Sequence, residues 1–325
     1  MEETNQNPRT DLTELISAIS NIREEVKKII VGQDSIVDML IAAILADGHV
    51  LIEGVPGIAK TLIAKIIART ISADFSRIQF TPDLMPSDIL GTSVYSMKTS
   101  EFEFNRGPIF SNIILIDEIN RAPAKTQSAL FEAMEERQVS VDGTSYKLDK
   151  PFIVIATQNP IEHEGTYKLP EAQLDRFIFK VEMGYPTPDE EIKILLELHS
   201  RKNVNDLSMI QPVLTKEKLK KYREIVRTIH LDEKVAKYIT QIVNGTRQNS
   251  DLYLGGSPRA SISIMIGAKA IAAISGRDFV TPDDVKMVVY STLRHRILLT
   301  PEKEMEGNTP DYIIKTILER LEVPR

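Results

Sequence analysis

A short loop that ends in lysine and threonine has the residue types and spacing needed to bind the phosphates of a nucleotide. Residues 49–53 before it have the aliphatic composition of a buried strand, and a helical pattern begins near Lys60. Glycines in such a loop let backbone N–H groups turn toward phosphate oxygens, and the helix N-terminus adds its positive end. We expect Lys60 to reach the β- and γ-phosphates of ATP and the Thr61 hydroxyl to bind Mg²⁺. The residues expected to contact the nucleotide here are Gly54, Val55, Pro56, Gly57, Ile58, Ala59, Lys60 and Thr61.

Ala59 occupies a position where the strict phosphate-loop pattern has glycine. The alternative interpretation is therefore a strand, a turn and a helix with an incidental lysine. Alanine is compatible with a phosphate loop if this position already has the negative φ of a helix, where a Cβ atom costs little. We therefore predict a negative φ at Ala59.

Two carboxylates follow a second aliphatic run, Ile113 to Ile116, and have the chemistry that nucleotide hydrolysis needs. If this run is a strand beside the loop, Asp117 would hold a water bound to Mg²⁺, and Glu118 would orient and polarise the attacking water. Adjacent acidic residues after a strand also begin ordinary loops. The phosphate loop favours the first interpretation, because a nucleotide site requires an acidic pair at this place.

Three further polar residues fit the same site. Asn159 follows another aliphatic run and could hold the attacking water or sense the γ-phosphate, although alone it is typical of a turn. Arg176 could complete the site of a neighbouring subunit as an arginine finger, or form a surface salt bridge with Asp175. Arg259 follows Pro258 in the first turn of an expected helix, and could point at the γ-phosphate or be a solvated side chain.

The elements that must position these residues alternate between strands and helices up to about residue 186. This alternation predicts a mostly parallel sheet with helices on both faces. Polar inserts at 91–110 and 138–148 predict hairpins, the second because it contains the turn signal Asp142-Gly143. The expected organisation is a disordered segment at 1–10, an α/β core at 11–186 and a helical lid domain at 187–325. The expected strands are His49 to Glu53, Ser76 to Phe80, Asn112 to Ile116, Phe152 to Thr157 and Phe177 to Val181.

Composition excludes several classes of function. The net charge of −6 argues against a dedicated nucleic-acid binder, which usually has a basic balance. No apolar run approaches the roughly 18 residues that span a membrane. The first ten residues are polar and unlike a signal peptide, so we expect a cytoplasmic protein. Cysteine is absent and the five histidines are scattered, so we expect no structural transition metal.

Several longer motifs resemble those of the AAA+ ATPases, and within them the MoxR family. The resemblance runs from about Ile22 to Leu298, and one departure is Lys168, where the family pattern has proline. The motifs that carry it are Gly54 to Thr61 (GVPGIAKT), Gln79 to Gly91 (QFTPDLMPSDILG), Gly107 to Phe110 (GPIF), Asp117 to Gln127 (DEINRAPAKTQ), Thr157 to Pro160 (TQNP), Gly165 to Phe177 (GTYKLPEAQLDRF) and Gly255 to Ala260 (GGSPRA).

The resemblance implies a Rossmann-like P-loop domain with a helical lid, assembled into rings, usually hexamers, with ATP between subunits. Val31, Gly32 and Gln33 match the segment that packs near adenine, and the family's own loop ends in the Ala-Lys-Thr found here. The residues at the family's catalytic and sensor positions are Lys60, Thr61, Asp117, Glu118, Asn159, Arg176 and Arg259. Members are thought to help activate or mature other proteins, including by metal-cofactor insertion, often with partners that contain a von Willebrand factor A domain.

The leading hypothesis is thus an ATPase that remodels a protein client, with the two inserts lining a pore or contacting the client. A DNA-acting AAA+ motor or initiator is the alternative, which the negative charge disfavours. A scaffold that binds ATP without turnover is a third, which intact Glu118 and Arg176 disfavour.

Overall fold

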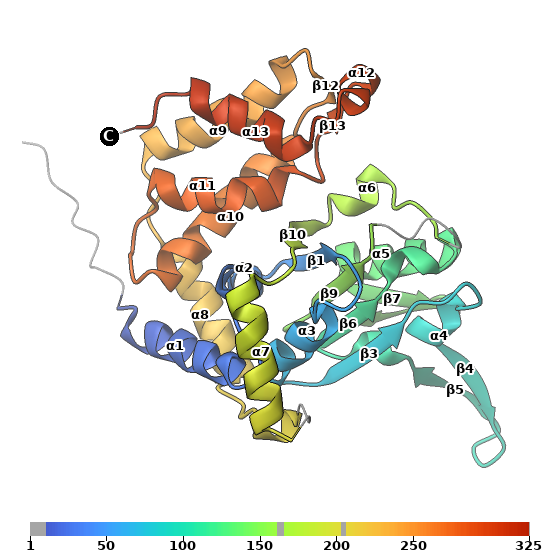
Figure 1. Cartoon of the computed structure of the whole chain (residues 1–325). Coiled ribbons are helices and arrows are strands. Elements are labelled where there is room, and N and C mark those ends of the chain that lie inside the picture. The colour runs from blue at the N-terminus through green and yellow to red at the C-terminus, as the bar shows by residue number, and fades with distance from the viewer. Residues whose placement is uncertain (1–10, 161–165, 203–205, 325) are drawn as a thin grey trace, which may run out of the picture.

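The computed structural model describes residues 11–160, 166–202 and 206–324 (Figure 1). The expected disordered segment at 1–10 lies outside these residues. In the part that is described, a parallel sheet of five strands has the order β10-β1-β9-β6-β3. The expected strands are therefore confirmed to within two residues. The strands are β1 (His49–Gly54), β3 (Phe75–Gln79), β6 (Ile113–Asp117), β9 (Ile153–Gln158) and β10 (Phe177–Met183).

Helices cover both faces of this sheet, as the aliphatic character of its strands requires. Val50 and Ile52 of β1 belong to one apolar core and Leu51 between them belongs to the other, because successive side chains of a strand point to opposite faces. The first core contains helices that precede and follow β1, and the second contains α5. These helices are α1 (Thr13–Lys27), α2 (Asp34–Leu45), α3 (Lys60–Arg69) and α5 (Ala124–Glu136).

Both polar inserts form hairpins, as predicted. One is β4 (Gly91–Ser96) with β5 (Glu101–Arg106), and the other is β7 (Gln138–Val141) with β8 (Thr144–Lys147). The second turns at Asp142-Gly143, both with positive φ. The hairpins touch each other, since the rings of Phe104 and Tyr146 stack with centroids 4.3 Å apart. Hairpin β4–β5 projects from the β3 end of the sheet (Figure 1).

The chain after residue 186 is mainly helical, and most of it lies on the β10 side of the sheet (Figure 1). Two short ribbons interrupt the helices: β11 (Leu214–Thr215) pairs with β2 (Ile71–Ser72), and β12 (Leu252–Leu254) pairs with β13 (Leu298–Leu299). The helices are α7 (Pro188–Ser200), α8 (Lys216–Thr228), α9 (Glu233–Gln248), α10 (Pro258–Ile274), α11 (Pro282–Leu293), α12 (Pro301–Met305) and α13 (Pro310–Arg320), in addition to the short core helices α4 (Pro86–Leu90) and α6 (Glu171–Leu174). Across the described ranges, every helix is too short or too polar to cross a membrane.

Candidate nucleotide-binding site

The carboxyl ends of three neighbouring strands bring the predicted phosphate and magnesium residues together. β1 leads into the loop before Lys60, β6 ends at Asp117, and β9 leads to Asn159. They surround a pocket of about 450 Å³. Its lining residues are Pro56, Gly57, Ala59, Lys60, Thr61, Leu62, Arg77, Gln79, Asp117, Glu118, Thr157, Gln158 and Asn159.

The loop turns sharply before α3, and this turn corrects the prediction for Ala59. Its φ is +66°, in the left-handed region, so the expected negative φ is wrong. The physical reason is that α3 begins at Lys60, which makes Ala59 the cap residue and leaves it outside the helix. A left-handed conformation costs an L-residue about 1–2 kcal/mol. Gly57 has φ +88°, which glycine adopts readily.

The ammonium group of Lys60 lies inside the loop. It donates to the carbonyl oxygen of Gly54, to that of Val55 at 3.3 Å and to that of Gln158 at 3.2 Å. These contacts hold a positive charge between the ends of β1 and β9. A phosphate group in this pocket would therefore meet a cation and the N-terminus of α3 together.

Thr61 and Asp117 form the part of the pocket that suits a magnesium ion. The Thr61 hydroxyl donates to Asp117 Oδ1 at 2.8 Å, and Thr157 Oγ1 lies 3.3 Å from the same oxygen. Hydroxyl and carboxylate oxygens are the ligands that Mg²⁺ prefers, so this donor set fits the ion. Arg77, which the sequence analysis missed, donates from Nε to Asp117 Oδ2 at 2.6 Å.

Glu118 faces the pocket, and two side chains that the sequence analysis assigned no role hold its carboxylate. Gln79 Nε2 donates to Glu118 Oε2 at 2.8 Å, and Arg121 Nε lies 3.2 Å from that oxygen. The Glu118 backbone N–H donates to Thr157 Oγ1 at 3.1 Å. Gln79 and Arg121 belonged to the family motifs. Only the pairing of β3 with β6, which places Gln79 opposite Asp117, reveals the contact of Gln79.

A second, mainly apolar pocket of about 400 Å³ adjoins the phosphate loop. Val31 and Gln33 line it together with Ile58, Tyr185 and Leu195. Gly32 does not line it; a Cβ atom on Gly32 would lie 2.2 Å from Glu190 Oε1. Gln33 has φ +61° and is the cap residue of α2, which begins at Asp34. The two pockets share loop residues, which gives one site with a polar and an apolar half.

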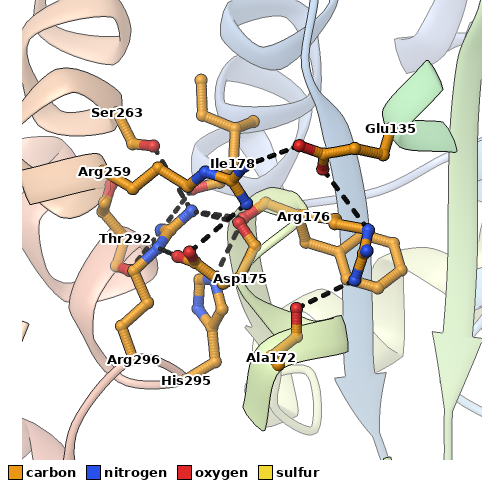
Figure 2. A network of polar contacts seen from close by, with 11 residues as sticks. Glu135, Ala172, Asp175, Arg176, Ile178, Arg259, Ser263, Thr292, His295 and Arg296 are labelled. Carbon is orange, nitrogen blue, oxygen red and sulfur yellow. Dashed lines mark hydrogen bonds and ion pairs between the residues drawn. The ribbon is translucent and has the colours of Figure 1, made fainter. Parts of the chain in front are cut away.

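Arg176 and Arg259 lie elsewhere, at the amino edge of the sheet, where both face the carboxylate of Glu135 (Figure 2). The cleft they line also contains Gly48 and His49, which precede and begin β1, whereas the phosphate loop follows the end of β1. Six residues of strand separate the two edges by roughly 17 Å at about 3.3 Å per residue. The structure therefore does not bring these arginines to the pocket of Lys60 in the same chain.

The contacts of Arg176 differ from the surface salt bridge considered as the alternative. Its Nη1 donates to Ala172 O at 3.0 Å, and its Nε lies 3.4 Å from Glu135 Oε2. Asp175 instead pairs with Arg296, whose Nε donates to its Oδ1 at 2.6 Å. Burial lowers the pKa of the Arg296 guanidinium, an effect that its bonds to Asp175 oppose.

The protein has a five-stranded parallel sheet, a phosphate loop after β1, an acidic pair at the end of β6 and a following helical domain. Together these features define an AAA+ type of ATPase. A family model described as "ATPase family associated with various cellular activities (AAA)" matches residues 49–179, and one described as "AAA lid domain" matches residues 244–317.

Individual relatives narrow this class to one family. The chain is 48% identical to protein YeaC of Bacillus subtilis, named as uncharacterized, over 93% of both chains. It is 44% identical to Chaperone MoxR1 of Mycobacterium tuberculosis, over 93% of this chain and 81% of that protein. The crystal structure of a provisionally named ATPase from Cytophaga hutchinsonii matches 97% of both chains with a TM-score of 0.88 and 41% identity. The chain thus belongs to the MoxR family of AAA+ ATPases, as its motifs predicted.

Proposed function

We propose that this protein hydrolyses ATP with Mg²⁺ as a cytoplasmic AAA+ chaperone that forms a ring and remodels or activates client proteins. The observation that carries the ATPase proposal is the single pocket that unites Lys60, Thr61, Asp117, Glu118 and Asn159. These residues supply a cation for phosphate, oxygen ligands for a metal ion, a carboxylate base and a polar group beside it.

Each of these side chains has a distinct part in the proposed reaction. Lys60 binds the β- and γ-phosphates, while Thr61 and Asp117 hold Mg²⁺, Asp117 through a water. A bound Mg²⁺ neutralises charge on the phosphate oxygens. Glu118 accepts a hydrogen bond from the attacking water and takes its proton, and Asn159 fixes the position of that water. Gln79 and Arg121 both contact Oε2 of Glu118, so its other oxygen, Oε1, is the one proposed to accept from the water.

The amino-edge position of Arg176 and Arg259 supports a site shared between subunits. Neither guanidinium reaches the pocket of its own chain, and both lie on a cleft of about 280 Å³ at the other edge of the sheet. In a head-to-tail ring, this edge of one subunit would meet the nucleotide bound to the next. Such a ring closes when a whole number of the rotations between subunits makes one full turn. We propose a hexamer in which Arg176 is the finger and Arg259 acts beside it.

The client side of the proposal rests on hairpin β4–β5. Met97 near its tip is 91% exposed and Phe102 is 74% exposed, so apolar side chains project into solvent. Exposed apolar side chains on a projecting element are typical of a protein contact. We propose that this hairpin touches the client, and that a partner with a von Willebrand factor A domain delivers it, including for metal-cofactor insertion.

The direct test is the Glu118→Gln variant of the assembled protein. ATP binding should persist while turnover falls about 10²–10⁴-fold, the usual contribution of a general base. Undiminished turnover would refute the assignment of Glu118. Duplex DNA should leave wild-type turnover unchanged at physiological salt, and DNA stimulation would favour a DNA-acting motor instead. The variant should also trap the client, which mass spectrometry can identify.

A further inference from the structure

A single carboxylate, Glu135, joins the two arginines that the proposed function assigns to the neighbouring subunit (Figure 2). Arg259 Nη2 donates to Glu135 Oε1 at 2.6 Å. Arg176 Nε lies 3.4 Å from Glu135 Oε2, an ion pair that lacks hydrogen-bond geometry. Arg176 comes from the core just before β10, and Arg259 comes from the first turn of α10. Glu135, near the end of α5, therefore links core and lid at one point.

The two arginines depend on Glu135 to different degrees. Arg176 also donates to Ala172 O, and its guanidinium lies 5.9 Å from the centre of the Phe131 ring. Arg259 makes one hydrogen bond within the described residues, to Glu135, and its only other ion pair there is with Asp175 at 3.6 Å. The side chain of Arg259 is also 50% exposed. Without Glu135, Arg259 would lose its defined orientation first.

Two guanidinium groups repel each other, and the carboxylate of Glu135, which pairs with both, offsets this repulsion. An arginine has five N–H donors, and Glu135 accepts one from Arg259 and faces one of Arg176. Donors therefore remain on both side chains for a further anion. The Glu135 carboxylate thus holds the two guanidinium groups together and uses only part of their N–H donors.

We propose that Glu135 is a positioning residue for the neighbouring subunit's site. It holds Arg176 and Arg259 side by side, so that both guanidinium groups meet the γ-phosphate of the nucleotide on the next subunit. This inference rests on the proposed function. It predicts that Glu135 acts on the turnover of the neighbour and leaves nucleotide binding by its own chain unchanged.

The test compares Glu135→Ala with Glu132→Ala, a matched control one turn earlier on the exposed face of α5. In the assembled protein, Glu135→Ala should lower kcat about 10–100-fold with KM nearly unchanged, since small misplacements of catalytic groups can cost about 100-fold. Glu132→Ala should match the wild type. Glu135→Asp, which keeps the charge on a shorter side chain, should lie between Glu135→Ala and the wild type.

Mixed rings separate positioning from a general loss of structure. Glu118→Gln subunits keep intact arginines, and Glu135→Ala subunits keep an intact nucleotide pocket. Where the two meet at an interface of a mixed ring, the site is complete. The mixture should therefore recover turnover that neither variant shows alone. In a random equal mixture, about one quarter of head-to-tail interfaces combine the two intact halves. Wild-type or raised turnover of Glu135→Ala alone would overturn the proposal, and so would a mixture without recovery.

The same mixture made with Arg176→Ala in place of Glu135→Ala tests the shared site itself. If the mixture with Arg176→Ala recovers turnover and Glu135→Ala alone has normal turnover, the role of Glu135 is refuted and the proposed function stands. Full turnover of Arg176→Ala alone would instead refute the shared site on which both proposals depend.

Discussion

The left-handed conformation of Ala59 has a measurable consequence for stability. Replacing Ala59 by glycine removes about 1–2 kcal/mol of strain. It also adds conformational freedom to the unfolded chain, which costs about 0.4–1 kcal/mol. Ala59 is exposed, so little packing is lost. The Ala59→Gly variant should therefore be more stable than the wild type by roughly 0.5–1 kcal/mol.

Urea denaturation without nucleotide measures this difference, followed by far-UV circular dichroism because the chain has no tryptophan. A higher midpoint at an unchanged slope would report the gain. Ala46→Gly is the control without strain: Ala46 is the C-cap residue of α2 at φ −74°, and it is half-buried against the first apolar core. It should lose roughly 0.5–1 kcal/mol. Equal losses in both variants would refute the left-handed conformation at Ala59.

Two further predictions concern stability. Burial lowers the pKa of His49 to about 3, so the unfolded state, with a pKa near 6.5, gains a proton there on acidification and the folded state does not. Lowering the pH from 6.5 to 5 should therefore cost about 1.6 kcal/mol of stability from His49 alone, measured by urea denaturation. His295, whose pKa burial also lowers, should add a further loss. The side chain of Arg296 is 3% exposed. Arg296→Met should destabilise the protein by about 3–5 kcal/mol, because it leaves the carboxylate of Asp175 without its main partner. The same denaturation assay measures this loss, and a loss below about 1 kcal/mol would contradict the prediction.

The sequence was sufficient for the strands and for the carboxyl-edge pocket. Short aliphatic runs rich in β-branched residues, such as Ile113 to Ile116, are typical of buried strands, and in a parallel sheet the polar residues that follow them lie at one edge. Asp142-Gly143 fixed the second hairpin, because few other pairs adopt two successive positive φ values at low cost. Local chemistry therefore determines these features.

Features that depend on tertiary packing could not be obtained in this way. Nothing in the sequence indicates that Gln79 contacts Glu118, because only the pairing of β3 with β6 places the two side chains together. The positive φ of Ala59 follows from where α3 begins, and helix boundaries are uncertain by a residue or two from sequence alone. The partner of Arg176 is Glu135, 41 positions away, whereas the alternative considered from the sequence was the adjacent Asp175.

The position of the lid decides how Arg259 can act. A lid that swung over its own phosphate loop would have to carry Arg259 past the length of β1, from one edge of the sheet to the other. Arg296 resists such a motion, because its guanidinium holds three backbone carbonyl oxygens in and just before β10. It donates to Asp175 O at 3.0 Å, Phe177 O at 2.8 Å and Ile178 O at 3.2 Å. Breaking a buried charged network of this kind costs about 3–5 kcal/mol, more than a lone contact of Arg259 with phosphate would return. The balance of energies therefore favours a fixed lid whose arginine serves the next subunit, and turnover that depends on assembly.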